Sequence, residues 1–152
     1  MIIQKINRIE SHNLEQTLKE VERLSSAYYK DMSKFYENSI YEVFDYISKS
    51  VRYVKDPKNT ELVMRPGLTL KRMSGDCDDK TVLFLAWLKL KKIPRGYSIV
   101  SDSDDKNYHH IFPFCYNKFS GMIVDLDATY PKNKIANSKK WSKRKNFFLG
   151  DK

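Results

Sequence analysis

The stretch KRMSGDCDDKTVLFLAWLKL, residues 71–90, decides how the rest of this chain is interpreted. Its second half, residues 82–90, is almost entirely apolar and leaves no polar face at helical spacing. A helix that is apolar all round belongs in the middle of a domain. The stretch therefore predicts a buried central helix that begins just after Gly75.

The start of this helix places a cysteine among three aspartates. Asp76 is expected to be the N-cap, with Asp79 near the N3 position, so Cys77 falls in the first turn. Backbone N–H groups at a helix N-terminus favour a thiolate and can face a developing oxyanion, whereas the neighbouring carboxylates oppose the thiolate. A cationic partner is needed to lower the pKa of Cys77, and histidine is the usual one.

The chain has three histidines. His12 lies at the start of the first expected helix and is interpreted as a surface residue. His109 and His110 are adjacent on an expected strand, so they point to opposite faces and only one of them can face Cys77.

The carboxylate that would orient this histidine depends on strand register. If the strands in residues 108–116 and 121–130 fold about a loop between Lys118 and Phe119, His110 lies opposite Asp127. A shift by one residue would exchange the histidines, and a shift by two would favour Asp125. A carboxylate on an inward face needs a partner, and orienting an imidazole is a suitable one.

The remaining elements predict an α+β fold, because helices precede strands along the chain. Apolar residues at helical spacing predict helices over about 13–30, where Asn13 and Gln16 resemble a capping box, and over about 34–50. Residues 55–74 contain Asp56-Pro57 and Pro66-Gly67 and are interpreted as a long irregular connection with one short extended piece. Strands are expected at 97–100, 108–116 and 121–130.

Length and composition predict one folded unit, since the 152 residues are 41% hydrophobic and 13% aromatic. The net charge of +9 is concentrated in residues 132–152, which hold eight Lys or Arg against one Asp. We therefore expect a domain over 1–131, with a helical part at 1–50 and a core at 51–131, followed by a basic tail at 132–152. A chain ending at Pro131 is expected to keep its fold, unless NFFLG, residues 146–150, adds an edge strand.

Three segments together resemble the transglutaminase-like cysteine peptidase superfamily. They are GDCDDKTVLFLAWLKLKKIPRG (75–96), the apolar strand led by His110, and VDLDATYP (124–131). The upstream VRYVKDPKNTELVMRPGLTL (51–70) resembles small stand-alone members from bacterial and phage genomes. The resemblance covers about residues 50–131, with Ala128 where the family often has proline. It implies a transglutaminase-like (papain-like) fold in which the cysteine helix packs on an antiparallel sheet.

Carried over to this sequence, the resemblance implies a Cys-His-Asp triad. Cys77 would be the nucleophile, His110 the general base and acid, and Asp127 the orienting carboxylate. No upstream side chain could be assigned to the oxyanion hole. The implied activity is that of a thiol-dependent amide hydrolase or acyl transferase, most simply a cysteine peptidase acting on a protein or peptide without a cofactor.

Other functions remain open at this stage. The chain could be a catalytically inactive virion or scaffold protein that binds another subunit, an acidic partner or nucleic acid through its basic tail, although a purely solubilising tail is favoured. A zinc site made of Cys77, Cys115, His109 and His110 lacks the ligand spacing of common structural sites. A disulfide between the two cysteines is a further, less favoured option.

The cellular location is expected to be the cytoplasm, or a virion if the gene belongs to a phage. The start of the chain lacks the order of a signal peptide, and no apolar stretch is long enough to span a membrane. Two cysteines outside a CxxC unit suit a reducing compartment.

Overall fold

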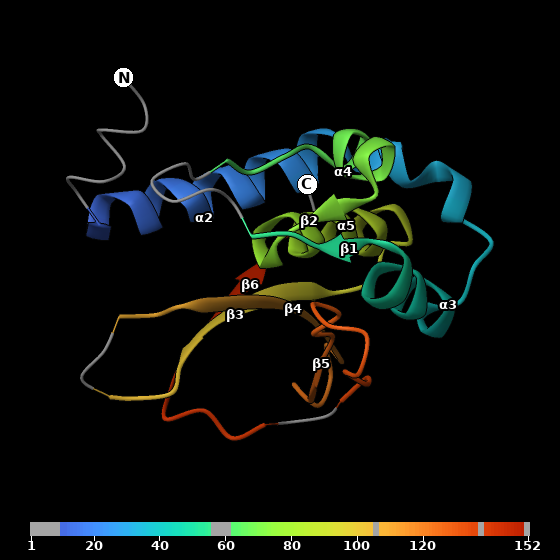
Figure 1. The fold of residues 1–152 in the computed structure, drawn as a ribbon. Coiled ribbons are helices and arrows are strands. Elements are labelled where there is room, and N and C mark those ends of the chain that lie inside the picture. Colours follow the sequence, from blue (N-terminus) through green and yellow to red (C-terminus); the bar gives the residue numbers. More distant parts are fainter. Residues whose placement is uncertain (1–9, 56–61, 105–106, 137–138, 151–152) are drawn as a thin grey trace.

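The computed structural model describes residues 10–55, 62–104, 107–136 and 139–150, with side chains from residue 14 onward. The fold is α+β: helices lie against one face of a four-stranded antiparallel sheet of order β5-β4-β3-β6 (Figure 1). The four strands are β3 (Arg95–Ser101), β4 (His110–Tyr116), β5 (Ile123–Asp125) and β6 (Lys143–Leu149).

The central helix is α5 (Cys77–Leu90), and its burial is confirmed, because every residue from Asp78 to Leu88 is buried. The N-terminal helices α2 (Glu10–Ala27) and η1 (Tyr29–Phe35) pack against it from one side, and β4 and β3 from the other. The indole N–H of Trp87 donates to the carbonyl of Phe35 at 2.8 Å, which ties α5 to η1. Among the helices in the described residues, none combines the length and hydrophobicity needed to cross a bilayer.

The helical part differs in detail from the expectation. The first helix begins at Glu10, before the predicted cap at Asn13; the side chain of His12 lies outside the described residues. The single helix expected over 34–50 was wrong, because the chain instead forms η1, α3 (Ile40–Asp45) and a π-helical turn η2 (Tyr46–Ser50). Ser39 and Glu42 cap each other's backbone N–H groups, so a new helix starts at Ile40.

The connection between residues 55 and 74 contains a helix that the sequence analysis missed. Helix α4 (Pro66–Arg72) has Pro66 at its first position, where the missing N–H costs nothing, so the interpretation of Pro66-Gly67 as part of an irregular connection was wrong. Two short strands, β1 (Arg52–Tyr53) and β2 (Ser74–Gly75), pair in parallel and set Tyr53 level with Gly75. They bring an upstream aromatic side chain to the start of α5.

The sheet contains the predicted strands β3 and β4, but the pairing of β4 with β5 differs. Phe114 pairs with Asp125 and Tyr116 with Ile123, which is two residues away from the expected register. Strand β5 is also shorter than expected, since it ends at Asp125.

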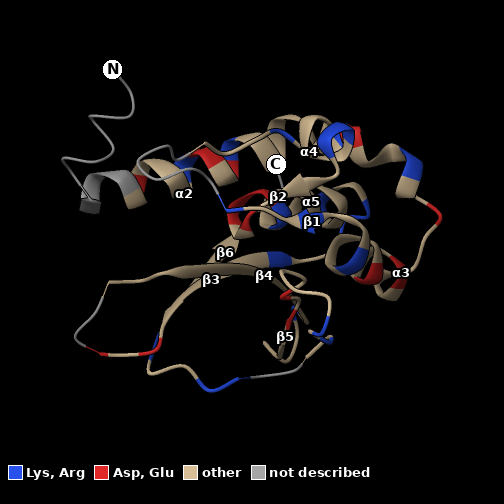
Figure 2. Ribbon diagram, viewed as in Figure 1, with Lys and Arg blue, Asp and Glu red and all other residues tan. Residues whose placement is uncertain are grey.

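The expected boundary at residue 131 needs correction, because the fold continues beyond it. Strand β6 pairs with β3 along its whole length, from Lys143 against Ser101 to Leu149 against Arg95. The rings of Tyr97 and Phe147 stack with centroids 4.9 Å apart. Basic residues lie along the connection that leads to β6 (Figure 2), and lysines on an exposed edge strand are a common protection against pairing with other chains. The segment interpreted as a basic tail therefore contains an edge strand, and its lysines suit that position.

Candidate active site

The start of α5 is held by reciprocal hydrogen bonds between Asp76 and Asp79, as predicted. The Asp76 carboxylate accepts from the N–H of Asp78 at 3.0 Å and of Asp79 at 3.2 Å, and Asp79 accepts from the N–H of Asp76 at 3.1 Å. The second oxygen of Asp79 accepts from the N–H of Met64 at 2.8 Å. A Cβ at Gly75 would lie 2.7 Å from the Cβ of Asp79, so only glycine fits before this cap. The cap fixes the position of Cys77.

This arrangement does not favour a thiolate in the resting protein. Two of the N–H groups that could stabilise an anion at the helix start are already bound by Asp76. Burial, together with the charges of Asp78 and Asp76, raises the pKa of the Cys77 thiol well above its ordinary value. The expectation that the helix start would favour a thiolate is therefore not met, and the thiol is neutral at pH 7.

His110 and Asp127 are joined by a hydrogen bond of 2.8 Å between Nε2 and Oδ2. The other carboxylate oxygen accepts from the hydroxyl of Thr129 at 2.6 Å and from its N–H at 3.2 Å. Burial alone would raise the pKa of Asp127, but the hydrogen bonds from His110 and Thr129 outweigh it and hold the pKa below its ordinary value. An ionised carboxylate only accepts, so Nε2 of His110 carries a proton, and in the neutral imidazole the lone pair is on Nδ1.

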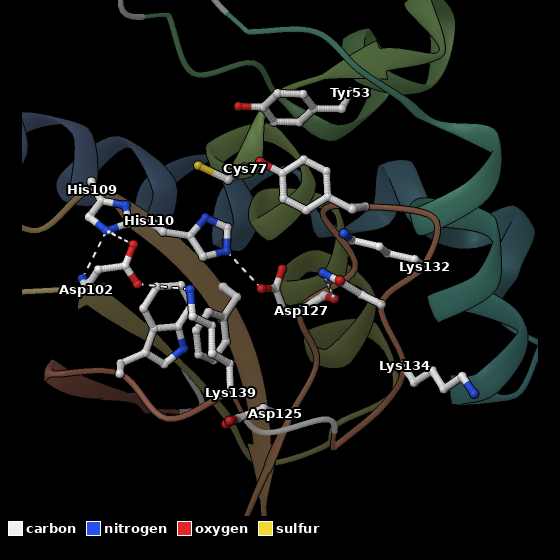
Figure 3. A pocket seen from close by; sticks show the side chains of 14 residues that line it. Tyr53, Cys77, Asp102, His109, His110, Asp125, Asp127, Lys132, Lys134 and Lys139 are labelled. Atoms are coloured by element: carbon white, nitrogen blue, oxygen red, sulfur yellow. Dashed lines mark hydrogen bonds and ion pairs between the residues drawn. The ribbon is translucent and has the colours of Figure 1, made fainter.

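Cys77, His110 and Asp127 line one pocket of about 480 Å³. Figure 3 shows the imidazole of His110 between Cys77 and Asp127, with one ring nitrogen on each side. The backbone of Ile111, the residue that follows His110, counteracts part of the rise in the pKa of Cys77. The structure thus brings together the three side chains that the sequence analysis selected.

The alternative histidine and carboxylate have other partners. The side chain of His109 is 46% exposed, against 11% for His110, and its Nε2 accepts from the N–H of Asp102 at 3.1 Å. Asp125 is held by both terminal nitrogens of Arg144, at 2.7 and 3.0 Å. Both residues line the pocket, but each of them binds a residue outside the set Cys77, His110 and Asp127.

The four residues considered for zinc do not form a cluster. Both cysteines are free, and Cys115 lies at the far end of β4, where it pairs with Arg95 and Val124. In the part of the chain that the structure describes, no group of three or more His, Cys, Asp or Glu side chains is arranged to hold a metal ion.

Two tyrosines beside Cys77 were not selected from the sequence. Tyr53 and Tyr130 line the pocket with ring centroids 5.1 Å apart. Burial, and then the proximity of Cys77 and Tyr130, raises the pKa of the Tyr53 hydroxyl, so this group is a proton donor at neutral pH. In Figure 3 the Tyr53 hydroxyl is directed toward the side on which Cys77 lies. Sequence carries no signal for this contact, because β1 and β2 bring Tyr53 into place.

Trp141 forms another wall of the pocket and comes from the segment interpreted as a tail. Its ring centroid lies 5.8 Å from that of His110 and 5.9 Å from that of His109. Lys139 lies over this indole at 4.2 Å and pairs with Asp102 at 2.9 Å. Together with the apolar NFFLG stretch, this tryptophan within a basic stretch was a signal that the segment is structured.

The pocket has more uncompensated positive than negative charge. Each of its carboxylates has a cationic or histidine partner: Asp102 binds Lys139, Asp125 binds Arg144 and Asp127 binds His110. Lys132 and Lys134 also line the pocket. Figure 3 shows the ammonium group of Lys132 directed into the pocket and that of Lys134 directed away from it.

Comparisons with known proteins add little to this geometry. No family model and no curated protein matches the chain. A crystal structure from Cytophaga hutchinsonii, provisionally described as a cysteine protease, is similar to it at 21% sequence identity and a TM-score of 0.44. The similarity covers 72% of this chain but only 37% of that protein. A similarity of this strength does not assign a function to the chain.

Proposed function

We propose that the protein is a thiol-dependent amide hydrolase of the transglutaminase-like type that acts on a protein or peptide. Cys77 is the nucleophile, His110 the general base and acid, and Asp127 the carboxylate that orients the imidazole. The observation that carries this proposal is the 2.8 Å hydrogen bond between His110 and Asp127 in the pocket that Cys77 lines. It leaves Nδ1 of His110 as the basic nitrogen on the side of the thiol.

The first half of the reaction forms an acyl-enzyme. Nδ1 of His110 takes the proton of the Cys77 thiol while Sγ bonds to the substrate carbonyl carbon, and negative charge develops on the carbonyl oxygen. The C–N bond then breaks, and the imidazolium gives its proton to the leaving amine. The products of this step are a free amine and a thioester on Cys77.

The second half regenerates the thiol. His110 takes a proton from water, the water oxygen bonds to the thioester carbon, and the C–S bond breaks as the proton returns to sulfur. The acyl group leaves as a carboxylic acid. If an amine replaces water, the same steps transfer the acyl group to a new amide, so hydrolysis and transfer share one machinery.

The raised pKa of Cys77 supports a general-base mechanism over a preformed thiolate–imidazolium pair. In the resting protein the buried thiol is neutral beside Asp76 and Asp78. Proton transfer to His110 then accompanies attack on the substrate, and ionised Asp127 stabilises the imidazolium that forms.

We assign two donors to the oxyanion. The backbone N–H of Cys77 lies at the helix start, where helical N–H groups have no partner within the helix. The hydroxyl of Tyr53, which stays protonated, is the second donor and supplies the upstream side chain that the sequence did not identify. Donors of this kind are worth about 2.7–4 kcal/mol each in the transition state.

The proposal is tested by trapping the acyl-enzyme. Wild-type protein and the Cys77→Ala and Cys115→Ala variants are incubated with a library of peptide esters and amides, and intact mass is recorded after acid quench. We expect acyl adducts on wild type and Cys115→Ala that disappear with Cys77→Ala, together with released amine in solution. A library that yields neither adduct nor released amine from the wild type would contradict the proposal.

A non-catalytic scaffold function is the second candidate, and one observation favours it. A buried thiol with a raised pKa is the state of an ordinary structural cysteine. In that case Cys77→Ala would change only thiol content and stability, and the basic residues between 132 and 145 would bind an acidic partner or nucleic acid. Retention on heparin that falls with salt, without any acyl adduct, would support the scaffold.

A further inference from the structure

A buried lysine lies one turn beyond Cys77 on α5. Lys80 is only 3% exposed, and its Nζ donates a hydrogen bond of 2.8 Å to the backbone carbonyl of Thr129. Lysine is rarely buried this deeply without a carboxylate partner, and among the described residues Lys80 forms no ion pair. The position therefore calls for an explanation other than packing.

The carbonyl that Lys80 binds belongs to the turn that carries Asp127. Thr129 closes this turn by donating its hydroxyl and its N–H to one oxygen of Asp127. The amide of Asn133 donates to the backbone carbonyl of Asp127 at 3.1 Å and holds the other side of the turn. Lys80 thus binds the same turn from α5, the helix that also carries Cys77.

The charge of Lys80 acts on the same carboxylate. Burial lowers the pKa of Lys80 to about 8, against the attraction of Asp127, which works in the opposite direction. At pH 7 the ammonium group is still largely protonated and favours the ionised form of Asp127. A buried charge of this kind opposes folding, so an apolar residue would suit the fold better.

We propose that Lys80 is a positioning residue that holds the Asp127 turn against α5 and thereby keeps His110 oriented toward Cys77. The catalytic purpose of Lys80 rests on the proposed function, whereas the contacts that hold the Asp127 turn do not depend on it. Through Lys80, the helix that carries the thiol of Cys77 also positions the carboxylate of Asp127, on the other side of His110. A shift of the turn by a fraction of an ångström would lengthen the His110–Asp127 hydrogen bond.

The test compares Lys80→Met with Lys89→Met. Lys89 is a matched control, because it also lies on α5 and donates to a backbone carbonyl, that of Ser26, at 3.0 Å, but at the opposite end of the helix. The first measurement is the tautomer of His110 and the exchange rate of its Nε2 proton, by NMR of protein labelled with ¹⁵N-histidine. The His110→Ala variant identifies the signal.

For Lys80→Met we expect the Nε2 proton to exchange roughly 10-fold faster or more, because the turn that shelters it opens locally. With an assay in hand, kcat should fall roughly 10- to 100-fold while KM changes little, as for other small misplacements in a catalytic site. Lys89→Met should match the wild type in both measurements. A Lys80→Met protein with wild-type tautomer and exchange rate would overturn the positioning role.

Two further comparisons keep the outcome decisive. If Lys80→Met does not fold, Lys80→Gln replaces it, because glutamine is polar but uncharged and one bond shorter than lysine, which withdraws the donor from the Thr129 carbonyl; faster exchange then supports the positioning role and wild-type exchange overturns it. The NMR measurement needs no substrate. Faster exchange in a protein that never forms an acyl adduct would therefore support the role of Lys80 while contradicting the proposed function, and an active enzyme with unchanged exchange would do the reverse.

Discussion

His110 and Asp127 form a 2.8 Å hydrogen bond although the strands that carry them are not paired in the register that would set them opposite each other. Extending the observed pairing of Phe114 with Asp125 would bring His110 level with Thr129. Strand β5 ends before this point, and the last backbone bond runs from the N–H of Leu126 to the carbonyl of Pro113 at 2.8 Å. Asp127 reaches the imidazole from a turn, so its side chain is free of the alternation that a strand imposes.

The carboxylates at 125 and 127 should therefore differ sharply when neutralised. Asp127→Asn should lower turnover by about 10³- to 10⁴-fold, since an amide cannot hold the imidazole with its proton on Nε2. Asp125→Asn should keep turnover near the wild-type value and lower the melting temperature, because it weakens the pair with Arg144. Steady-state kinetics and thermal unfolding of both variants check this, and equal losses of turnover would show that the two carboxylates act together.

The two histidines offer a similar comparison. His110→Ala should abolish acyl transfer, because it removes the base beside Cys77. His109→Ala should keep most of it, since this side chain is half exposed and bound to Asp102. The rate of acyl-adduct formation measures both effects. A larger loss in His109→Ala than in His110→Ala would show that His109, and not His110, is the base.

Alkylation should distinguish the two cysteines. Burial raises the pKa of both Cys77 and Cys115, so the difference comes from access: Cys77 lines the pocket and should react faster with iodoacetamide. The alkylation rate of Cys77 should rise with pH, and the midpoint of this rise should lie above the free-cysteine pKa of about 8.5. Peptide mapping after timed quenches gives both profiles. A Cys77 rate already at its plateau at pH 7 would show a preformed thiolate.

The raised pKa of Cys77 also predicts how the stability of the fold depends on pH. The folded-state pKa of Cys77 lies above the unfolded value, so the folded protein keeps a proton that the unfolded chain loses. Its contribution to stability is complete below the unfolded pKa of about 8.5 and declines as pH rises above it. Denaturant unfolding should show this decline in wild type and a smaller one in Cys77→Ala.

Removal of residues 132–152 should destabilise the fold, in contrast to the expectation from charge alone. The deletion removes β6 from the length of β3, the Phe147 ring stacked on Tyr97 and the Trp141 wall beside His110. Circular dichroism and thermal unfolding of the shortened protein should show a large loss of stability. A stable protein ending at Pro131 would mean that β6 contributes little.

The direction of Lys132 into the pocket predicts a preference for anionic reagents at Cys77. Iodoacetate carries a negative charge and iodoacetamide does not, so the ratio of their rates at Cys77 reports the local potential. Lys132→Glu should lower this ratio several-fold, and Lys134→Glu, with its side chain directed away, should lower it less. Equal effects at both positions would indicate only a general influence of net charge.

Local patterns in the sequence were sufficient for the central part of the fold. The apolar run after residue 81 predicted the burial of α5, and the spacing of Asp76 and Asp79 predicted its cap, because each depends on residues within a few positions of one another. Alternation and flanking turns likewise located β3 and β4. The adjacency of His109 and His110 required that they differ in exposure, as they do.

Contacts between distant residues decided the rest. The edge strand β6 looked like a charged tail because its pairing with β3 and the stack of Phe147 on Tyr97 exist only in the folded chain. The raised pKa of Cys77 reflects burial that no spacing reveals, and the sequence suggested the opposite direction. In the sequence, Lys80 cannot be told from a surface lysine. In the fold it is buried, and it binds the turn that carries Asp127. In each case the free energy of the interaction comes from desolvation and from partners that the tertiary fold brings together. The sequence therefore specifies which residues are present, and only the structure decides which of them interact.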